Sequence, residues 1–352
     1  MLSGNKGEWS ELWVLCNLIE SGVLATADSN LQTSPGNQVL VEAISLRSKT
    51  SNFTFIPFDR ITPGARVGNV TERIDRDWFR KTITAFQREL LSTWGSNKEL
   101  QAGNALAASL GVYTLKASSS EKVDIWLQLA SPHGLAPVEL GYSIKSQIGG
   151  SSTLLNAGRT SNFVYELANF DGNIEKTNCT TSNSKVRAIL ANALAASREI
   201  VFYECENSTF ADNLDMFNQD LKEDLASMVL DYYKGNSTTI SEAFWSLCAD
   251  NDEHNFERAL KYRLGEFLNA VALGMTPGKQ WNGGLKGHGG YIVVKPDTSV
   301  VGLHLANKQE FIDYLFKSTK FDTASTTRHD FGRVYQSGNK YLIKLNLQIR
   351  FI

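Results

Sequence analysis

Apolar and polar residues alternate in two neighbouring stretches of the chain. Every second residue along 122–129 is apolar: Val123, Ile125, Leu127 and Leu129. Residues 139–147 repeat the alternation with the apolar residues Leu140, Tyr142 and Ile144. A period of two on both sides of a His-Gly-Leu-Ala-Pro connection predicts a β-hairpin that packs one face on the core.

The other, open face of this hairpin carries most of the chemistry. Asp124 falls on the first strand, and Ser143, Lys145 and Gln147 fall on the second. An acid and a lysine on paired strands form the arrangement that metal-dependent nucleases use to cut phosphodiesters, so DNA cleavage is the leading interpretation. The structural alternative is an exposed cross-strand ion pair, which contributes little stability. Small residues such as Gly141 favour the functional interpretation, because they let a ligand approach the backbone closely.

Helical and strand periods account for most of the remaining chain. They predict helices over 8–20, 75–94, 99–111, 185–196, most of 209–274 and 308–316, and strands over 39–46, 52–56, 291–295, 300–305 and 340–351. After Gly149-Gly150, the hydroxyls of residues 151–153 offer N-caps for a further helix that would include Glu166. We expect a nuclease core over 1–200, a helical section over 201–275 and a mixed section over 276–352.

Charge is distributed unevenly, although the net charge of the 352 residues is only −2. Residues 201–275 hold 14 acids and 5 Lys or Arg, a net of −9, whereas residues 276–352 hold 11 Lys or Arg and 5 acids, a net of +6. DNA affinity arises from local neutralisation of phosphates, so the basic section can bind DNA despite the overall balance. Two solvated faces of opposite sign explain the same counts equally well.

Several classes of protein are disfavoured by what the sequence lacks. The four cysteines contain no CxxC pair, which argues against a zinc site and a disulfide framework. No apolar run is long enough to span a bilayer and no signal-peptide pattern is present, so we expect a cytoplasmic protein without a membrane partner. A serine hydrolase, an ATPase and a dehydrogenase are disfavoured because their motifs are missing.

Phosphodiester hydrolysis needs an activated water and a cation that absorbs charge on the phosphate. Mg²⁺ supplies much of this while bound by one or two carboxylates and water, and Asp124 is the best candidate ligand. Lys145 would stabilise the pentavalent transition state or orient the attacking water. The second carboxylate is left open between Glu11 and Glu166, while Glu8 is better explained by stabilisation of a helix N-terminus.

Short segments along the whole chain are similar to sequences of one enzyme family. They are GNKGEWSE at 4–11, GYSIKSQ at 141–147, TLLNA at 153–157, TSNF at 160–163, KFDT at 320–323, RHDFG at 328–332 and LNLQIRF at 345–351. Through these segments, taken in order, the chain resembles the HpaII-type restriction endonucleases. Residues 30–110 and 200–275 contribute little to the resemblance.

This resemblance implies a type II restriction enzyme with a PD-(D/E)xK core, an α/β (α+β) fold in which helices flank a central mixed β-sheet. It also implies a prokaryotic enzyme that needs Mg²⁺ and cuts a short sequence in double-stranded DNA, with CCGG as the target associated with the family prototype. Asp124 and Lys145 match the core motif, whereas Ser143 stands where the usual acid would be. A two-fold symmetric target would call for a homodimer, and a DNA methyltransferase would be its functional partner.

Candidates for reading the target lie in the glycine-rich, flexible segment 278–288 and in two later arginines. Bases in the major groove are read by Arg or Lys at guanine and by Asn or Gln at adenine. The candidates are Lys279, Gln280, Asn282, Lys286, His288, Arg328 and Arg333. The alternative is contact with phosphate or water, and contacts to phosphate and sugar are the commoner kind in such interfaces.

Two other functions stay open from the sequence. A structure-specific repair nuclease or junction resolvase would use the same core and cut according to DNA shape. A DNA-binding protein with an inactive nuclease site is the other, because Ser143 is not an acid.

Overall fold

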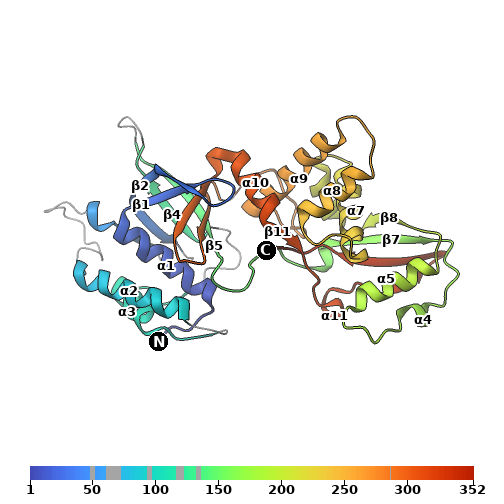
Figure 1. The fold of residues 1–352 in the computed structure, drawn as a ribbon, viewed down its shortest axis with the longest axis horizontal. Helices are drawn as coiled ribbons and strands as arrows, with labels where there is room; N and C mark the ends of the chain where they lie inside the picture. Colours follow the sequence, from blue (N-terminus) through green and yellow to red (C-terminus); the bar gives the residue numbers. More distant parts are fainter. Residues whose placement is uncertain (48–51, 61–72, 93–96, 116–122, 132–135, 286) are drawn as a thin grey trace. The chain divides into compact units, whose positions relative to one another are not determined.

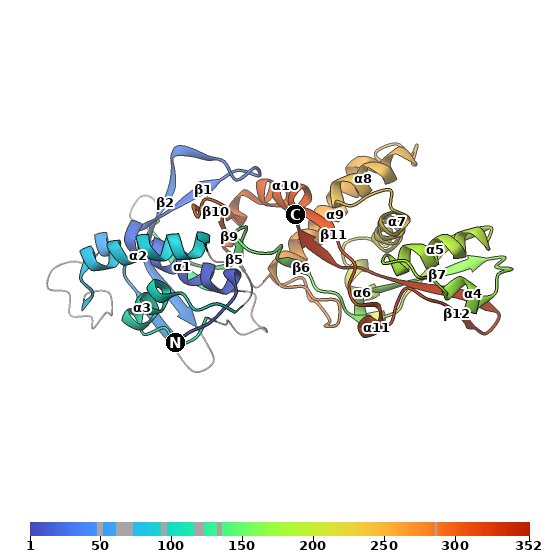
Figure 2. The same cartoon turned by 60° about the horizontal axis from the view of Figure 1, so that its bottom comes forward.

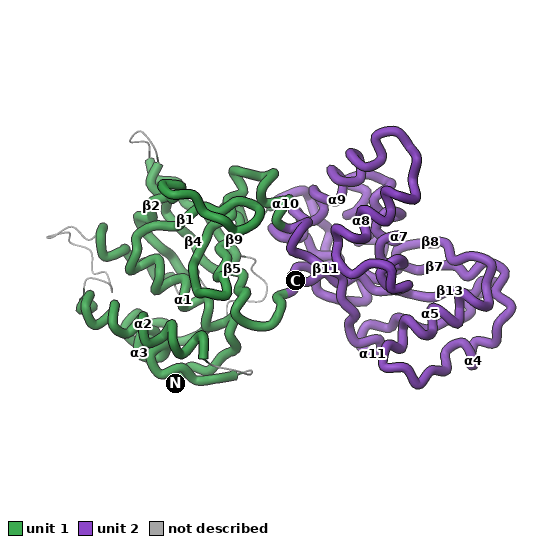
Figure 3. Tube along the Cα trace, in the orientation of Figure 1, with its two compact units in different colours: residues 1–152, 285–314 green, residues 153–284, 315–352 purple. Residues whose placement is uncertain are grey.

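A computed structural model describes residues 1–47, 52–60, 73–92, 97–115, 123–131, 136–285 and 287–352. The chain divides into two compact units (Figure 3). Unit 1 comprises residues 1–152 and 285–314, and unit 2 comprises residues 153–284 and 315–352. Each unit is therefore discontinuous in sequence, and its boundaries differ from the predicted section ends at 200 and 275.

Unit 1 is built on a seven-stranded mixed sheet with the order β1-β10-β9-β5-β4-β2-β3. The strands are β1 (Val23–Ala27), β2 (Thr33–Arg47), β3 (Asn52–Phe55), β4 (Ile125–Leu129), β5 (Val138–Ser146), β9 (Gly290–Val294) and β10 (Val300–His304). β5 runs parallel to β9 and β1 parallel to β10, while the other neighbours are antiparallel. The predicted central mixed sheet and the β4–β5 hairpin are confirmed, although the hairpin connection at 132–135 lies outside the described residues.

Helix α1 (Lys6–Ser21) lies on one face of this sheet, and α2 (Arg76–Ser92) and α3 (Gln101–Leu110) pack against α1 (Figures 1 and 2). Asn5 caps α1 and Glu8 reaches back to the Asn5 amide, which completes a capping box. Gly22 ends α1 with a φ of 66°, a left-handed conformation that glycine adopts without strain. The predicted helix-terminus role of Glu8 is thereby confirmed.

Burial along α1 is not confined to one narrow stripe, since Leu12, Leu15, Cys16 and Ile19 are buried together with residues on other sides of the helix. The additional buried residues are Trp9, Trp13, Val14 and Leu18. A helix that is apolar on most sides is a helix enclosed by neighbours, and α1 has the sheet on one side and two helices on the other. The opposite face of the sheet is covered at Tyr291, whose ring packs edge-on against Phe311 of α10 (Lys308–Ser318) with centroids 5.0 Å apart. Helices therefore flank the sheet.

Unit 2 contains two antiparallel sheets, with the orders β11-β14-β6 and β12-β13-β7-β8. Their strands are β6 (Thr153–Leu155), β7 (Asn162–Ala168), β8 (Glu199–Cys205), β11 (Thr319–Phe321), β12 (Val334–Ser337), β13 (Lys340–Asn346) and β14 (Ile349–Phe351). The helices are α4 (Ile174–Asn178), α5 (Lys185–Ala195), α6 (Ser208–Asp215), α7 (Leu221–Lys234), α8 (Ile240–Ala249), α9 (Phe256–Leu273) and α11 (Thr326–His329). Across the described part of both units, no helix is long and apolar enough to cross a membrane.

The helix predicted after Gly149-Gly150 is wrong, because this stretch forms β6 and β7. Phe163, Val164 and Tyr165 are buried in succession, so β7 is covered on both faces. A strand buried on both faces loses the alternation by which strands are recognised, and a short apolar run then resembles a buried helix. The Tyr165 hydroxyl donates to the Ala226 carbonyl of α7 at 2.7 Å, which ties this strand to the helix behind it.

Candidate active site

Asp124 immediately precedes β4, at the point where β4 stops pairing with β5. Its amide donates to the Tyr142 carbonyl at 2.9 Å. β5 continues beyond Tyr142, the last residue that it pairs with β4. The backbone N–H of Ile144 therefore has no carbonyl of β4 opposite it and needs another acceptor. It donates to Asp124 Oδ2 at 2.6 Å, and the Ser143 hydroxyl donates to the same oxygen at 3.0 Å. The carboxylate is thereby fixed at the end of the strand pair.

Ser143 links Lys145 to the Asp124 carboxylate through two hydrogen bonds. Lys145 Nζ donates to Ser143 Oγ at 2.9 Å and lies 5.0 Å from the centroid of the Tyr291 ring. Burial lowers the pKa of the Lys145 ammonium, whereas the charges of Asp124 and Glu11 oppose this effect. Ser143 is only 5% exposed, so the predicted open face is wrong at this position. Ser143 pairs in register with Tyr291 of the neighbouring parallel strand β9.

Glu11 of α1 belongs to the same group of charges. Burial raises the pKa of its carboxyl from 4.5 to about 8, with a further rise from the charge of Asp124 and a smaller lowering effect of Lys145. Glu11 and Asp124 both line a cavity of about 50 Å³ together with Glu8 and apolar side chains. Two carboxylates that share a small, largely apolar cavity repel each other unless a proton or a cation lies between them.

This pair has the donor chemistry of a site for a hard divalent cation. Mg²⁺ prefers oxygen ligands and keeps several of its waters, so one or two carboxylates are sufficient to hold it. Among the described residues, no group of three or more His, Cys, Asp or Glu is arranged as a metal centre. The candidate is therefore a two-carboxylate site, Asp124 from the hairpin and Glu11 from α1.

The other predicted members of the site lie elsewhere. Gln147 follows the end of β5, and it is exposed, with its amide donating to the Val294 carbonyl at 2.8 Å. Glu166 lies on β7 of unit 2 and forms an ion pair with Lys340, so its carboxylate already has a partner. Tyr291 was not predicted, because an aromatic residue in a buried strand gives no sign of which side chain its ring will meet.

The predicted base-reading residues of segment 278–288 fall in both units. Lys279, Gln280 and Asn282 are exposed in unit 2. The backbone around them is held, since Asn213 donates to the Lys279 carbonyl and accepts from the Trp281 amide, each at 2.9 Å. These two hydrogen bonds tie the backbone at Lys279 and Trp281 to Asn213 of α6.

The remaining base-reading candidates are scattered. His288 is exposed in unit 1, and Lys286 lies outside the described residues. Arg328 and Arg333 are exposed in unit 2, where Arg328 is part of α11 and Arg333 follows it. The structure thus brings together four of the predicted site residues: Asp124, Ser143, Lys145 and Glu11.

Comparison with known proteins identifies the family. A family model of the HpaII restriction endonuclease matches residues 5–351. The chain is also 34% identical to the type II restriction enzyme HpaII of Haemophilus parainfluenzae, over 99% of each chain. No solved structure matches it. Because both sequence matches extend over nearly the whole chain, this protein belongs to the HpaII restriction endonuclease family and is a type II, site-specific deoxyribonuclease.

Proposed function

We propose that this enzyme hydrolyses phosphodiester bonds of double-stranded DNA with Mg²⁺ held by Asp124 and Glu11. The observation that carries the proposal is the shared cavity of these two acids, in which burial and the Asp124 charge raise the pKa of Glu11 to about 8. A carboxyl group with such a pKa is poised to exchange its proton for a cation.

The arrangement supports a PD-(D/E)xK core in which one acid has moved. Asp124 precedes one strand and Lys145 lies on its partner, two positions after Ser143. Ser143 cannot serve as the anionic ligand expected at its position. Glu11 supplies a carboxylate from α1 instead, and this explains how the site can keep two acids although the strand carries only one.

Each residue of the group has a distinct role in this proposal. When bound, Mg²⁺ supplies a Lewis acid for the phosphate and lowers the pKa of a bound water. Lys145 places a positive charge beside the scissile phosphate, in a setting where burial strengthens its interaction with the developing negative charge. Ser143 holds the side chains of Lys145 and Asp124 in place, because its hydroxyl accepts a hydrogen bond from Lys145 Nζ and donates one to Asp124 Oδ2.

The proposals for the target sequence, the oligomeric state and the partner enzyme rest on the family resemblance. We propose CCGG as the target, a homodimer that cuts both strands, and a partner methyltransferase that protects the same sequence. A cytoplasmic location is in keeping with the four free cysteines. Lys279, Gln280, Asn282, Lys286, His288 and Arg328 stay candidates for contact with this DNA.

Digestion of unmethylated plasmid DNA with Mg²⁺ or with EDTA tests the proposal, with the cut ends sequenced. We expect Mg²⁺-dependent fragments that share one terminal sequence. Asp124→Ala and Lys145→Gln should abolish cutting and leave binding to a labelled duplex in EDTA unchanged. Glu99→Gln, at an exposed acid outside the site, is the matched control and should cut normally. Cutting in EDTA, ends without a shared sequence, or normal cutting by Asp124→Ala would contradict the proposal.

A further inference from the structure

Unit 2 contains a groove of about 780 Å³ whose lining comes from residues 178–189, residues 326–335 and Lys344. All of these residues belong to unit 2, whereas Asp124, Glu11 and Lys145 belong to unit 1. The lining holds three cations, Lys185, Arg333 and Lys344, and one acid, Asp330, a local net charge of 3 − 1 = +2. The hydroxyls of residues 180, 326 and 327 add further hydrogen-bonding groups.

Two of these cations are available to an external anion. Lys185 and Arg333 are exposed and form no ion pair with any residue that the structure describes. Lys344 is shared between two acids, since its Nζ lies 3.2 Å from Asp330 Oδ2 and 2.6 Å from Glu206 Oε1. These acids are therefore paired with Lys344 and not with Lys185 or Arg333. The groove therefore presents positive charge that is not compensated within the described part of the protein.

The backbone on both sides of Arg333 is fixed. The Gly332 amide donates to the Lys344 carbonyl at 2.8 Å. The Asn178 side chain donates to the Val334 carbonyl and accepts from the Val334 amide, each at 2.8 Å. An arginine on a backbone held in this way loses less conformational entropy when it binds a ligand than one on a free loop.

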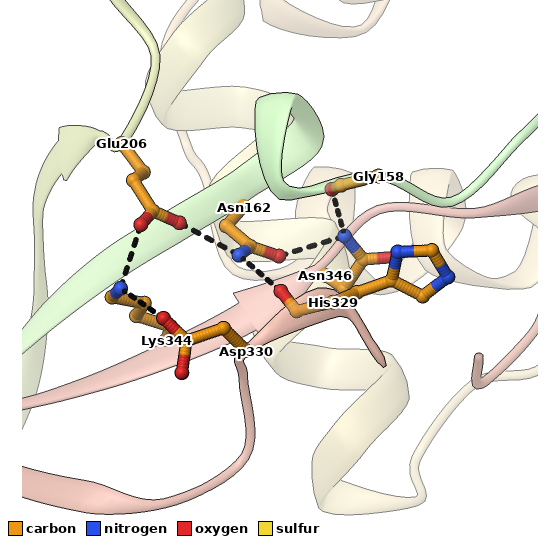
Figure 4. A network of polar contacts seen from close by, with 7 residues as sticks. All are labelled: Gly158, Asn162, Glu206, His329, Asp330, Lys344 and Asn346. Atoms are coloured by element: carbon orange, nitrogen blue, oxygen red, sulfur yellow. Dashed lines mark hydrogen bonds and ion pairs between the residues drawn. The ribbon is translucent and has the colours of Figure 1, made fainter. Parts of the chain in front are cut away.

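A polar network also holds His329 and Asp330, which precede Arg333 (Figure 4). The side-chain Nδ2 of Asn162 donates to the His329 carbonyl at 3.0 Å and to the Glu206 carboxylate at 2.7 Å. Lys344 joins Glu206 to Asp330, and Asn346 donates to Asn162 Oδ1 at 2.7 Å. Buried asparagines on β7 and β13 thus anchor the segment that leads to Arg333.

We propose that this groove binds the phosphate backbone of the DNA substrate, with Arg333 and Lys185 as the phosphate-contacting residues. The proposal rests on the proposed function in taking duplex DNA as the substrate, and its test also takes CCGG as the target sequence. A concave, cationic lining with hydroxyl groups is complementary to the convex, anionic backbone of a duplex, whereas base reading needs side chains that project into a DNA groove. Arg333 is thereby assigned to phosphate contact, in place of the base contact predicted from the sequence.

Salt dependence of DNA binding tests this assignment in the full chain. The probes are two fluorescein-labelled duplexes, one containing CCGG and one lacking it, titrated by anisotropy in EDTA at several salt concentrations. Each lost phosphate contact lowers the slope of log Kd against log salt by about 0.9. We expect this change for Arg333→Gln and for Lys185→Gln, about twice the change for the double variant, and weakening on both duplexes by the same factor.

Arg198→Gln is the matched control, because Arg198 is exposed in the same unit and does not line the groove. Arg333→Gln and Lys185→Gln variants with the slope and affinity of Arg198→Gln would overturn the groove assignment. So would an Arg333→Gln variant that weakens binding to the CCGG duplex alone, since that result indicates base reading. A wild-type protein that binds in this way but never cuts would overturn the catalytic proposal and leave the groove assignment standing.

Discussion

Glu11→Gln should make the metal-free protein more stable at neutral pH while it removes a ligand of the proposed Mg²⁺ site. Burial is the largest cause of the raised pKa of Glu11, and the charge of Asp124 adds to it. Both effects penalise the ionised carboxylate in the folded protein. Glutamine keeps the size of the side chain and carries no charge, so it avoids this penalty.

The sign and size of the effect follow from the two pKa values. Below pH 4.5 Glu11 is protonated in the folded and unfolded chains alike, and it contributes nothing. Between 4.5 and about 8 the folded protein keeps a proton that the unfolded chain has lost, so stability falls as the pH rises. At about 1.36 kcal/mol per unit, the loss is about 3 kcal/mol at neutral pH and about 5 kcal/mol at its limit above the folded pKa.

Urea unfolding in EDTA, measured from acid pH to above pH 8, checks this expectation. The free energy of unfolding of wild type should fall over that range more steeply than that of Glu11→Gln. Mg²⁺ at a hundredfold excess over its Kd should then stabilise wild type by about 2.7 kcal/mol and Glu11→Gln much less. Glu99→Gln, at an exposed acid, should follow wild type throughout. Parallel pH curves for wild type and Glu11→Gln would refute the reasoning.

Two further predictions concern the support of the unit 2 groove. Gly332→Ala should destabilise the protein by about 1–3 kcal/mol, because Gly332 has a φ of 79° and an added Cβ would lie 2.7 Å from Val186 Cγ2. Urea unfolding that shows no loss of stability would contradict this prediction. Asn346→Ala should cost about 1–3 kcal/mol, because it leaves the buried Asn162 Oδ1 without its donor. An unchanged thermal midpoint would be the contrary result.

The hairpin was predictable from sequence because its signal is local. Leu127 and its neighbours alternate on one buried face, and strand pairing then places Asp124 beside the strand that carries Lys145. The approach of Glu11 to this pair is different in kind. It depends on how α1 packs on the sheet, and the sequence around residue 11 could only present an acid near an apolar stripe.

Glu166 shows the converse case. Its neighbours on β7 are buried on both faces, so the period of the strand was hidden and a helix was the natural interpretation. The pairing of Glu166 with Lys340 is set by the antiparallel arrangement of β7 and β13, whose residues are far apart in the chain. Candidate ligands chosen from sequence are therefore most reliable where a single hairpin fixes their geometry.

Burial at the candidate active site acts on its acid and its base in opposite directions. It raises the pKa of Glu11 and lowers that of Lys145, so it favours the neutral form of each. A cation bound between Glu11 and Asp124 would ionise Glu11, but exchange of its proton for Mg²⁺ would raise the net charge of the two acids and the bound ion from −1 to 0, which weakens the stabilisation of the nearby Lys145 ammonium. In the proposed site, metal binding and the charge of Lys145 are therefore coupled.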